Sequence, residues 1–227
     1  MKALISICFN GLFIGFVFCQ TPKEYGVKVF NDVAVYNQLV KINPSFKLVD
    51  LKNYENLFFD IRYATENNFT EQIIYNSPDA FARRLVAEAL NKANTRFNQL
   101  GFAIKVYDAY RPYDTTVKFY EIFKDTTYVA SPYTGSRHNR GCAVDITLVE
   151  LNTGVELQMQ TEYDDFTEKA HPDYQDLSED ALKNRKVLIE TMQQFGFTVY
   201  PSEWWHFDFN DWKKYPLMNL TFEQLKQ

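Results

Sequence analysis

Three histidines are the side chains of this sequence best suited to bind a metal: His138, His171 and His206. Two of them lie in unusual surroundings. His138 stands in the run SRHNRGCAVD, which ends at Asp145, and His206 closes the run SEWWH, which contains Glu203. Imidazole and carboxylate groups are common nitrogen and oxygen ligands of metal ions, so these two segments are the first candidates for a reactive site.

A catalytic zinc site needs three such ligands and an open position for water. It also needs a carboxylate that takes the proton of that water, and often a cation that stabilises the oxyanion of the intermediate. The sequence offers a candidate for each part. The candidate ligands are His138, Asp145 and His206, the candidate base is Glu203, and the candidate cation is Arg111.

Each of these side chains also has a structural interpretation when it is taken alone. A histidine among aromatic residues is more often a core residue with satisfied hydrogen bonds than a ligand. Asp145 stands in an apolar segment, where an unpaired carboxylate is costly to bury, but a salt bridge with Arg137 or Arg140 would satisfy it. Glu203 and Arg111 could be solvated surface charges.

Short apolar segments predict the strands that would carry these residues. Residues 102–110 form a buried strand that ends before Arg111, and residues 57–64 form another. Residues 142–149 alternate between apolar and other residues, which places Asp145 on one face of a strand. Residues 204–209 alternate in the same way.

Glu203 can share a site with His206 only where the strand is irregular. Residues three apart on a regular strand face opposite ways. We therefore expect Glu203 in the turn after Pro201 or at a bulge.

Two longer segments carry helical signals. Ser77-Pro78 predicts a helix start, followed by an apolar stripe that ends before Gly101, and Ser178 predicts the cap of a helix closed by Gly196. The stripe is expected to pack in the core and consists of Phe81, Leu85, Ala89, Ala93 and Phe97. Residues 20–50 are weakly patterned and are expected to wrap the surface. Strands and helices mix without a βαβ rhythm, which predicts an α+β fold with a mainly antiparallel central sheet flanked by helices.

Composition describes one globular domain. The chain has 227 residues, 46% of them hydrophobic and 23% charged, with a net charge of -5 and no long basic run. Nucleic acid is therefore not expected as a partner. With few cysteines in the sequence, a zinc-finger arrangement is excluded.

The N-terminal segment has the pattern of a signal peptide. Lys2 precedes an apolar stretch from Ala3 to Cys19, which is short for a membrane span. We expect residues 1–19 to be removed, leaving a catalytic domain at residues 20–227 that is exported to the periplasm or the extracellular space and not inserted in the membrane. Cys142 would then be the single thiol. The alternative is an uncleaved membrane anchor.

The combined motifs resemble a known family. SxHxxGxAxD at residues 136–145, followed by ExWH at residues 203–206, resembles the metal signature of the vancomycin-resistance-type D-alanyl-D-alanine dipeptidases, within the wider group of zinc D,D-peptidases. Further similar blocks run in the expected order from about residue 57 to about residue 209. They include FDIRYAT at 59–65, YDAYRP at 107–112, MQTEYDDFTEKAH at 159–171 and the segment 184–197.

The resemblance implies a role for each candidate. His138, Asp145 and His206 would hold one zinc ion (Zn2+) in a single zinc-peptidase domain. Glu203 would be the general base and later the acid, and Arg111 would stabilise the tetrahedral intermediate.

Two further residues match positions where the family holds its substrate, a small D,D-dipeptide. These are Ser136 and Asp164, the latter by pairing with the free ammonium group. His171 matches a family histidine for which a structural or outer-shell role is favoured over ligation. The implied reaction is hydrolysis of D-Ala-D-Ala in cell-wall peptide turnover. The alternatives are a D,D-carboxypeptidase acting on longer peptidoglycan peptides and a non-catalytic zinc domain that binds peptidoglycan.

Overall fold

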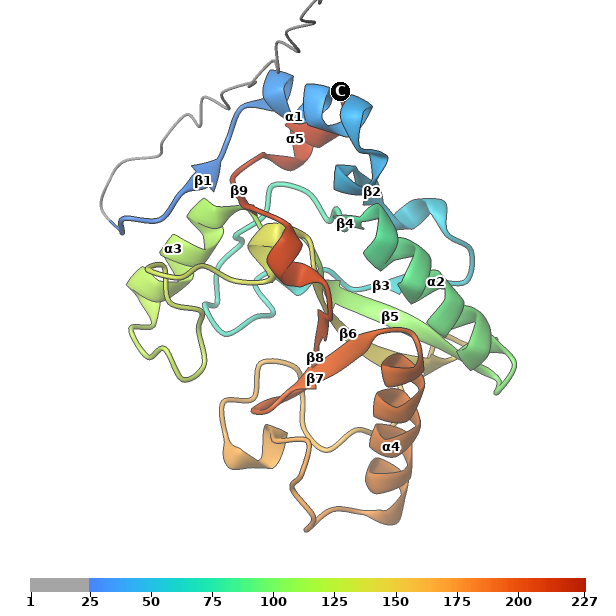
Figure 1. Cartoon of the computed structure of the whole chain (residues 1–227). Helices are drawn as coiled ribbons and strands as arrows, with labels where there is room; N and C mark the ends of the chain where they lie inside the picture. The colour runs from blue at the N-terminus through green and yellow to red at the C-terminus, as the bar shows by residue number, and fades with distance from the viewer. Residues whose placement is uncertain (1–24) are drawn as a thin grey trace, which may run out of the picture.

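A five-stranded sheet forms the centre of the protein, whose computed structural model describes residues 25–227 (Figure 1). Its strands are β3 (Phe58–Phe59), β5 (Phe102–Asp108), β6 (Ala143–Glu150), β7 (Phe197–Tyr200) and β8 (Glu203–Phe209). Their order is β3-β5-β6-β8-β7, and each neighbouring pair is antiparallel except β3 with β5. The predicted α+β class with a mainly antiparallel sheet is confirmed.

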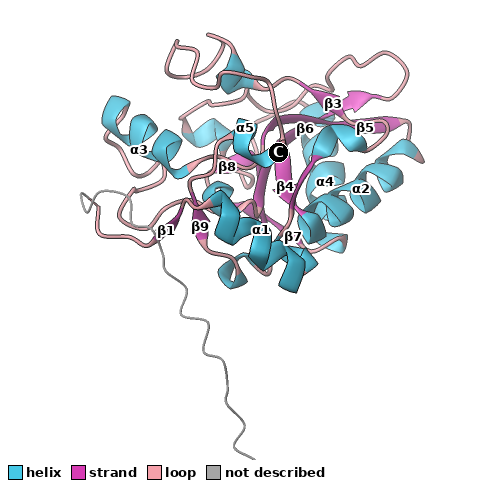
Figure 2. Cartoon of the chain, turned by 90° about the horizontal axis from the view of Figure 1, so that it is seen from above, coloured by secondary structure: helices cyan, strands magenta, loops and turns pink. Residues whose placement is uncertain are grey.

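Two helices, α2 (Arg84–Asn98) and α4 (Glu179–Gln194), lie side by side on one face of this sheet, while α3 (Tyr113–Ile122) lies on the other side (Figures 1 and 2). The Ser178 side chain accepts a hydrogen bond from the Ala181 amide at 3.2 Å and caps α4, as the sequence predicts. The sheet face opposite α2 and α4 is left to carry polar side chains.

The predicted helix start at Ser77-Pro78 is wrong. Residues Phe81–Arg83 form strand β4, which pairs antiparallel with β2 (Leu48–Asp50), and α2 begins only at Arg84. The partner strand lies in the weakly patterned N-terminal stretch, so this long-range pairing overrides the local helical signal. The predicted stripe is confirmed in part: Phe81, Ala93 and Phe97 are buried, but Leu85 is 41% exposed. The other buried apolar residues of α2 include Val86 and Leu90.

The segment expected to wrap the surface contains regular structure. It includes β1 (Val29–Phe30) and α1 (Val33–Ile42), and β1 pairs in parallel with β9 (Leu217–Met218), just before α5 (Phe222–Leu225). The predicted signal peptide, residues 1–19, lies outside the described residues. Among the helices of residues 25–227, none has the length and apolarity that crossing a membrane requires.

A row of ionisable residues crosses three neighbouring strands. Asp108 of β5 stands opposite Asp145 of β6, and Asp145 stands opposite His206 of β8. Directly paired residues point to the same face of a sheet, so the three side chains are neighbours. All three are buried. The sheet register therefore concentrates charge and metal-binding capacity at one place.

Candidate active site

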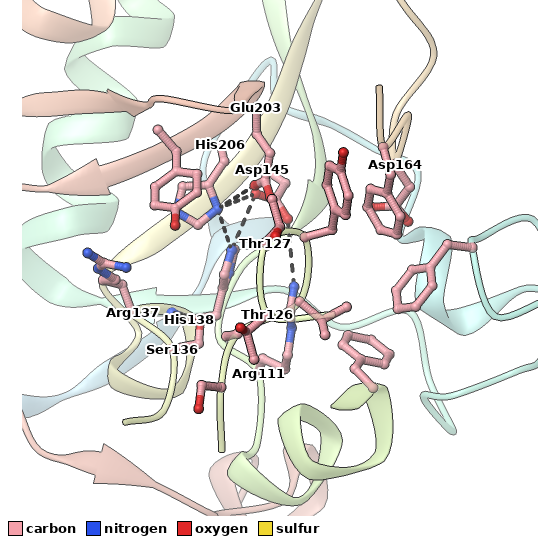
Figure 3. Close-up of a pocket in the computed structure, with 18 of the residues that line it drawn as sticks. Arg111, Thr126, Thr127, Ser136, Arg137, His138, Asp145, Asp164, Glu203 and His206 are labelled. Atoms are coloured by element: carbon pink, nitrogen blue, oxygen red, sulfur yellow. Dashed lines mark hydrogen bonds and ion pairs between the residues drawn. The ribbon is translucent and has the colours of Figure 1, made fainter. Parts of the chain in front are cut away.

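The two histidines and the aspartate singled out from the sequence converge on one point (Figure 3). His138 Nε2 lies 3.2 Å from His206 Nδ1 and 3.3 Å from Asp145 Oδ1. The third side of the triangle, from His206 Nδ1 to Asp145 Oδ1, measures 3.2 Å. The three atoms come from a short 3-10 turn, from β6 and from β8, so only the folded chain brings them together.

A backbone carbonyl fixes the ring of His138. The Nδ1 atom lies 2.6 Å from the carbonyl oxygen of Ala109. A carbonyl only accepts, so Nδ1 must carry the proton and Nε2 presents its lone pair to the site. The turn that holds His138 ends at Gly141, whose φ of +68° favours glycine, and its position leaves no room for a side chain beside Leu48.

Asp208 orients the second histidine. Its Oδ1 atom lies 2.9 Å from Nε2 of His206, two residues earlier on the same face of β8. A carboxylate accepts the Nε2 proton and leaves the Nδ1 lone pair directed at the site. Metal-binding histidines commonly have such a carboxylate or carbonyl partner, which fixes the tautomer and the orientation of the ring.

Asp145 is hydrogen-bonded through one oxygen only. Oδ2 accepts a hydrogen bond from the Tyr163 hydroxyl at 3.0 Å and lies 3.8 Å from Nη2 of Arg111. Oδ1, the atom that faces the two imidazoles, is buried without a hydrogen-bond partner among the described residues. Buried acceptors are rarely left unpaired, so a missing partner at this point is informative.

The donor set fits a zinc ion. Two imidazole nitrogens and one carboxylate oxygen are typical catalytic zinc ligands, and a tetrahedral ion about 2.0–2.1 Å from each ligand places the ligands roughly 3.3–3.4 Å apart. The distances of 3.2–3.3 Å between the three atoms match this value. A cation here would also satisfy the unpaired oxygen of Asp145.

Glu203 reaches the site through the irregularity that the sequence requires. Val199 of β7 pairs with Phe207 but the next residue, Tyr200, pairs with Glu203, so residues 204–206 bulge away from β7. Glu203 Oε2 thereby lies 3.4 Å from His206 Nδ1, with 14% of its side chain exposed. Burial raises the pKa of the Glu203 carboxyl to about 7. A carboxylate of this kind is suited to proton transfer near neutral pH.

Arg111 is held rigidly beside the same point. Its Nε and Nη2 atoms donate to Oδ2 of Asp108 at 3.0 and 2.8 Å. Asp108 Oδ1 accepts from the Tyr75 hydroxyl at 2.9 Å. The guanidinium carbon lies 4.8 Å from the ring centre of Phe119, which supports one face of the group. The cation is therefore preorganised.

A cavity of about 300 Å³ opens above these residues. Asp164 lines it with a left-handed backbone, φ +62°, and with an Oδ2 atom that is buried without a hydrogen-bond partner among the described residues, while Oδ1 accepts from the Tyr63 hydroxyl at 3.2 Å. Burial raises the pKa of Asp164 well above its usual range. Ser136 also lines the cavity, and its hydroxyl oxygen accepts from the amide of His138 at 3.1 Å.

Aromatic rings close the cavity around Asp164. Phe166 stacks on Tyr128 with ring centres 5.0 Å apart and lies 5.2 Å from Phe69. Phe69 in turn lies 6.2 Å from Tyr63, the hydrogen-bond partner of Asp164. These rings therefore line the same cavity as Asp164.

His171 is not among the residues that line the cavity. Its backbone carbonyl accepts from Gln160 at 2.8 Å, which anchors the loop before α4. Sequence reasoning missed Asp108 and Asp208. Asp208 could have been found from its position two residues after His206, which places both on one strand face. Asp108 could have been found from its position three residues before Arg111, the cation that it holds.

Comparison with known proteins shows the family of this chain. The family model Peptidase_M15, D-Ala-D-Ala dipeptidase, matches residues 45–224. A D-alanyl-D-alanine dipeptidase of Escherichia coli (strain K12) is 31% identical over 182 residues, 80% of this chain and 94% of the relative. One from Enterococcus faecalis is 29% identical over 184 residues, 72% of this chain and 91% of the relative. A crystal structure of a vancomycin-resistance D,D-pentapeptidase with Zn(II) covers 67% of this chain and 88% of its own, at 17% identity and a TM-score of 0.41.

The geometry predicts that substitution of the ligand His206 and substitution of Asp208, which orients it, weaken zinc binding to different extents. His206→Ala should lose zinc, because two remaining ligands hold the ion poorly. Asp208→Asn should keep a zinc site of about 10- to 100-fold lower affinity, because the imidazole loses its orienting carboxylate. Competitive titration with a zinc chelator checks both variants, with Asp211→Asn as a surface control on the same segment. Unchanged zinc affinity in His206→Ala would rule out the assigned ligand set.

Proposed function

The chain belongs to the D-Ala-D-Ala dipeptidase family, and we propose that its cavity hydrolyses D-alanyl-D-alanine, or a closely related D,D-dipeptide, to free D-amino acids. In this proposal His138, Asp145 and His206 hold one zinc ion. The observation that carries it is the pairing of this donor set with the unpaired carboxylate oxygen of Asp164 in the same cavity. The donor set supports hydrolysis, and the Asp164 carboxylate supports recognition of the ammonium group of a small substrate.

Glu203 is assigned the proton transfers. When bound, zinc polarises the scissile carbonyl and lowers the pKa of water at the site. Glu203 Oε2 lies 3.4 Å from His206 Nδ1 and therefore stands beside the metal position without being needed as a ligand. It can take a proton from the attacking water and pass it to the leaving amine.

Arg111 is assigned the stabilisation of negative charge. Its guanidinium is fixed by Asp108 and reaches within 3.8 Å of Asp145 Oδ2, at the edge of the metal position. A buried cation that is already oriented does not have to reorganise when charge develops on the tetrahedral intermediate. Ser136 lines the same cavity and is assigned to substrate binding through its hydroxyl group.

Asp164 favours a dipeptide over a longer peptide. Its buried Oδ2 atom lacks a partner within the described part of the chain, and a free ammonium group would supply one. In a longer donor strand this nitrogen is an uncharged amide, which would leave the Asp164 carboxylate without a charged partner. This feature supports a dipeptidase over the alternative D,D-carboxypeptidase acting on longer peptidoglycan peptides.

We propose further that the protein acts outside the cytoplasm, in turnover of cell-wall peptides. The support is the sequence of residues 1–19, where one cation precedes an apolar stretch. Export would favour hydrolysis of released wall fragments over removal of a cytoplasmic precursor pool.

Glu203→Ala should retain zinc and the fold but lose at least about 10²- to 10⁴-fold in kcat, because one group serves both proton transfers. Zinc content and release of D-alanine from D-Ala-D-Ala are measured together. Glu162→Ala, an exposed change outside the cavity, is the control. Full turnover in Glu203→Ala would refute the mechanism.

Asp164→Asn should raise KM for D-Ala-D-Ala about 10- to 100-fold while zinc content is unchanged, because the charged partner of the ammonium group is lost. The neighbouring Asp165→Asn, which does not line the cavity, should leave KM as it is. The proposed recognition of the ammonium group fails if both variants have the KM of the unmodified protein.

The mature protein should begin near Gln20 and contain Cys142 as its single thiol. N-terminal sequencing of exported protein and thiol titration check this. Recovery of the protein only in the cytoplasm, with Met1 intact, would contradict the proposed export.

A further inference from the structure

Arg137 lines the cavity but has no role in the mechanism described so far. It stands between Ser136 and His138 in the metal-binding segment, and 36% of its side chain is exposed. A cation in the wall of a small cavity either balances a charge of the protein or meets a charge of the ligand. The contacts of Arg137 distinguish these two possibilities.

The guanidinium group is held in place mainly by rings. Its carbon lies 4.9 Å from the ring centre of Trp212 and 5.6 Å from that of Tyr200, which also lines the cavity. Nε lies 3.3 Å from Oδ2 of Asp208, the carboxylate whose other oxygen orients His206. Stacking and one ion pair therefore position the group next to a metal ligand.

Most of its donors are left for a ligand. A guanidinium group has five N–H donors, and Nε, although it lies 3.3 Å from Asp208 Oδ2, makes no hydrogen bond among the described residues. Neither terminal nitrogen of Arg137 has a hydrogen-bond partner among residues 25–227. Arg111 differs, because it directs two nitrogens at Asp108 and is buried between Tyr63 and Phe119. Of these two cations in the cavity wall, Arg137 is the one available to an anion.

Arg137 and Asp164, two charged groups of the cavity with unpaired polar atoms, lie on opposite sides of the metal position. Figure 3 shows Arg137 on the side of His206 and Asp164 on the far side, with Asp145 between them. A dipeptide zwitterion has the same arrangement: an ammonium group, the scissile carbonyl and then a carboxylate. With the ammonium at Asp164 and the carbonyl at the metal position, the carboxylate would lie on the side of Arg137.

We propose that Arg137 binds the C-terminal carboxylate of the D,D-dipeptide and so makes the enzyme selective for a free C-terminus. This rests on the proposed function. The planar guanidinium fork matches a carboxylate, and such charge-assisted contacts are among the stronger hydrogen bonds. Asp164 and Arg137 then bind the two charged ends of the substrate. Asp208 contacts both Arg137 and the metal ligand His206.

The test compares D-Ala-D-Ala with D-alanyl-D-alaninamide, which keeps the ammonium group and the scissile bond but lacks the carboxylate. Arg137→Gln should lower kcat/KM for D-Ala-D-Ala about 10- to 100-fold, the effect of losing a hydrogen bond to a charged group. It should change kcat/KM for the amide less than about threefold, so the preference for the acid collapses. Arg137→Lys should restore part of that preference, because the charge is retained.

Arg140→Gln is the matched control, since Arg140 lies 5.3 Å from the same Trp212 ring but does not line the cavity. It should keep the wild-type preference for the acid. A structural role of Arg137 would lower the rates for acid and amide equally, and that result, like an unchanged preference in Arg137→Gln, would overturn the inference while leaving the dipeptidase function intact. If the unmodified protein cleaves neither compound, both proposals fail.

Discussion

The structure depends on three buried atoms that carry lone pairs and lie 3.2–3.3 Å from one another. They are His138 Nε2, Asp145 Oδ1 and His206 Nδ1. The Ala109 carbonyl and the Asp208 carboxylate fix the protons of His138 and His206 on the outer nitrogens, so the inner atoms all present lone pairs. Because one of these atoms, Asp145 Oδ1, is a buried carboxylate oxygen without a hydrogen-bond partner among the described residues, the arrangement is unfavourable unless a cation lies between them. The surrounding fold holds the three atoms in this geometry.

The register of the central sheet sets the positions of the site residues. β5, β6 and β8 place Asp108, Asp145 and His206 in one row, and the bulge in β8 turns Glu203 toward the end of that row. The opposite face of the sheet is packed against α2 and α4, which leaves little freedom for the strands to slide. A shift of one residue in the register would move Asp145 to the apolar face and dismantle the site.

The sequence predicted what is local and periodic. The alternation of residues 142–149 placed Asp145 on one strand face, and the three-residue spacing of Glu203 and His206 required an irregular strand, which the structure contains. It could not predict β4, because its partner β2 lies more than thirty residues away in a stretch without a pattern. The cavity wall depends in the same way on packing between segments distant in sequence: the ring of Phe166 meets those of Phe69 and Tyr128, and Arg137 faces Asp164 only across the folded cavity.

The protein is a zinc-dependent D,D-dipeptidase. The most direct measurement is metal analysis of the purified mature protein together with the release of D-alanine from D-Ala-D-Ala, before and after chelation and after zinc is returned. We expect one zinc ion per chain, turnover that disappears on chelation and returns with zinc, and little release of D-alanine from a longer peptide ending in D-Ala-D-Ala. A protein that holds zinc but releases no D-alanine from any D,D-dipeptide would contradict it and would favour a non-catalytic zinc domain.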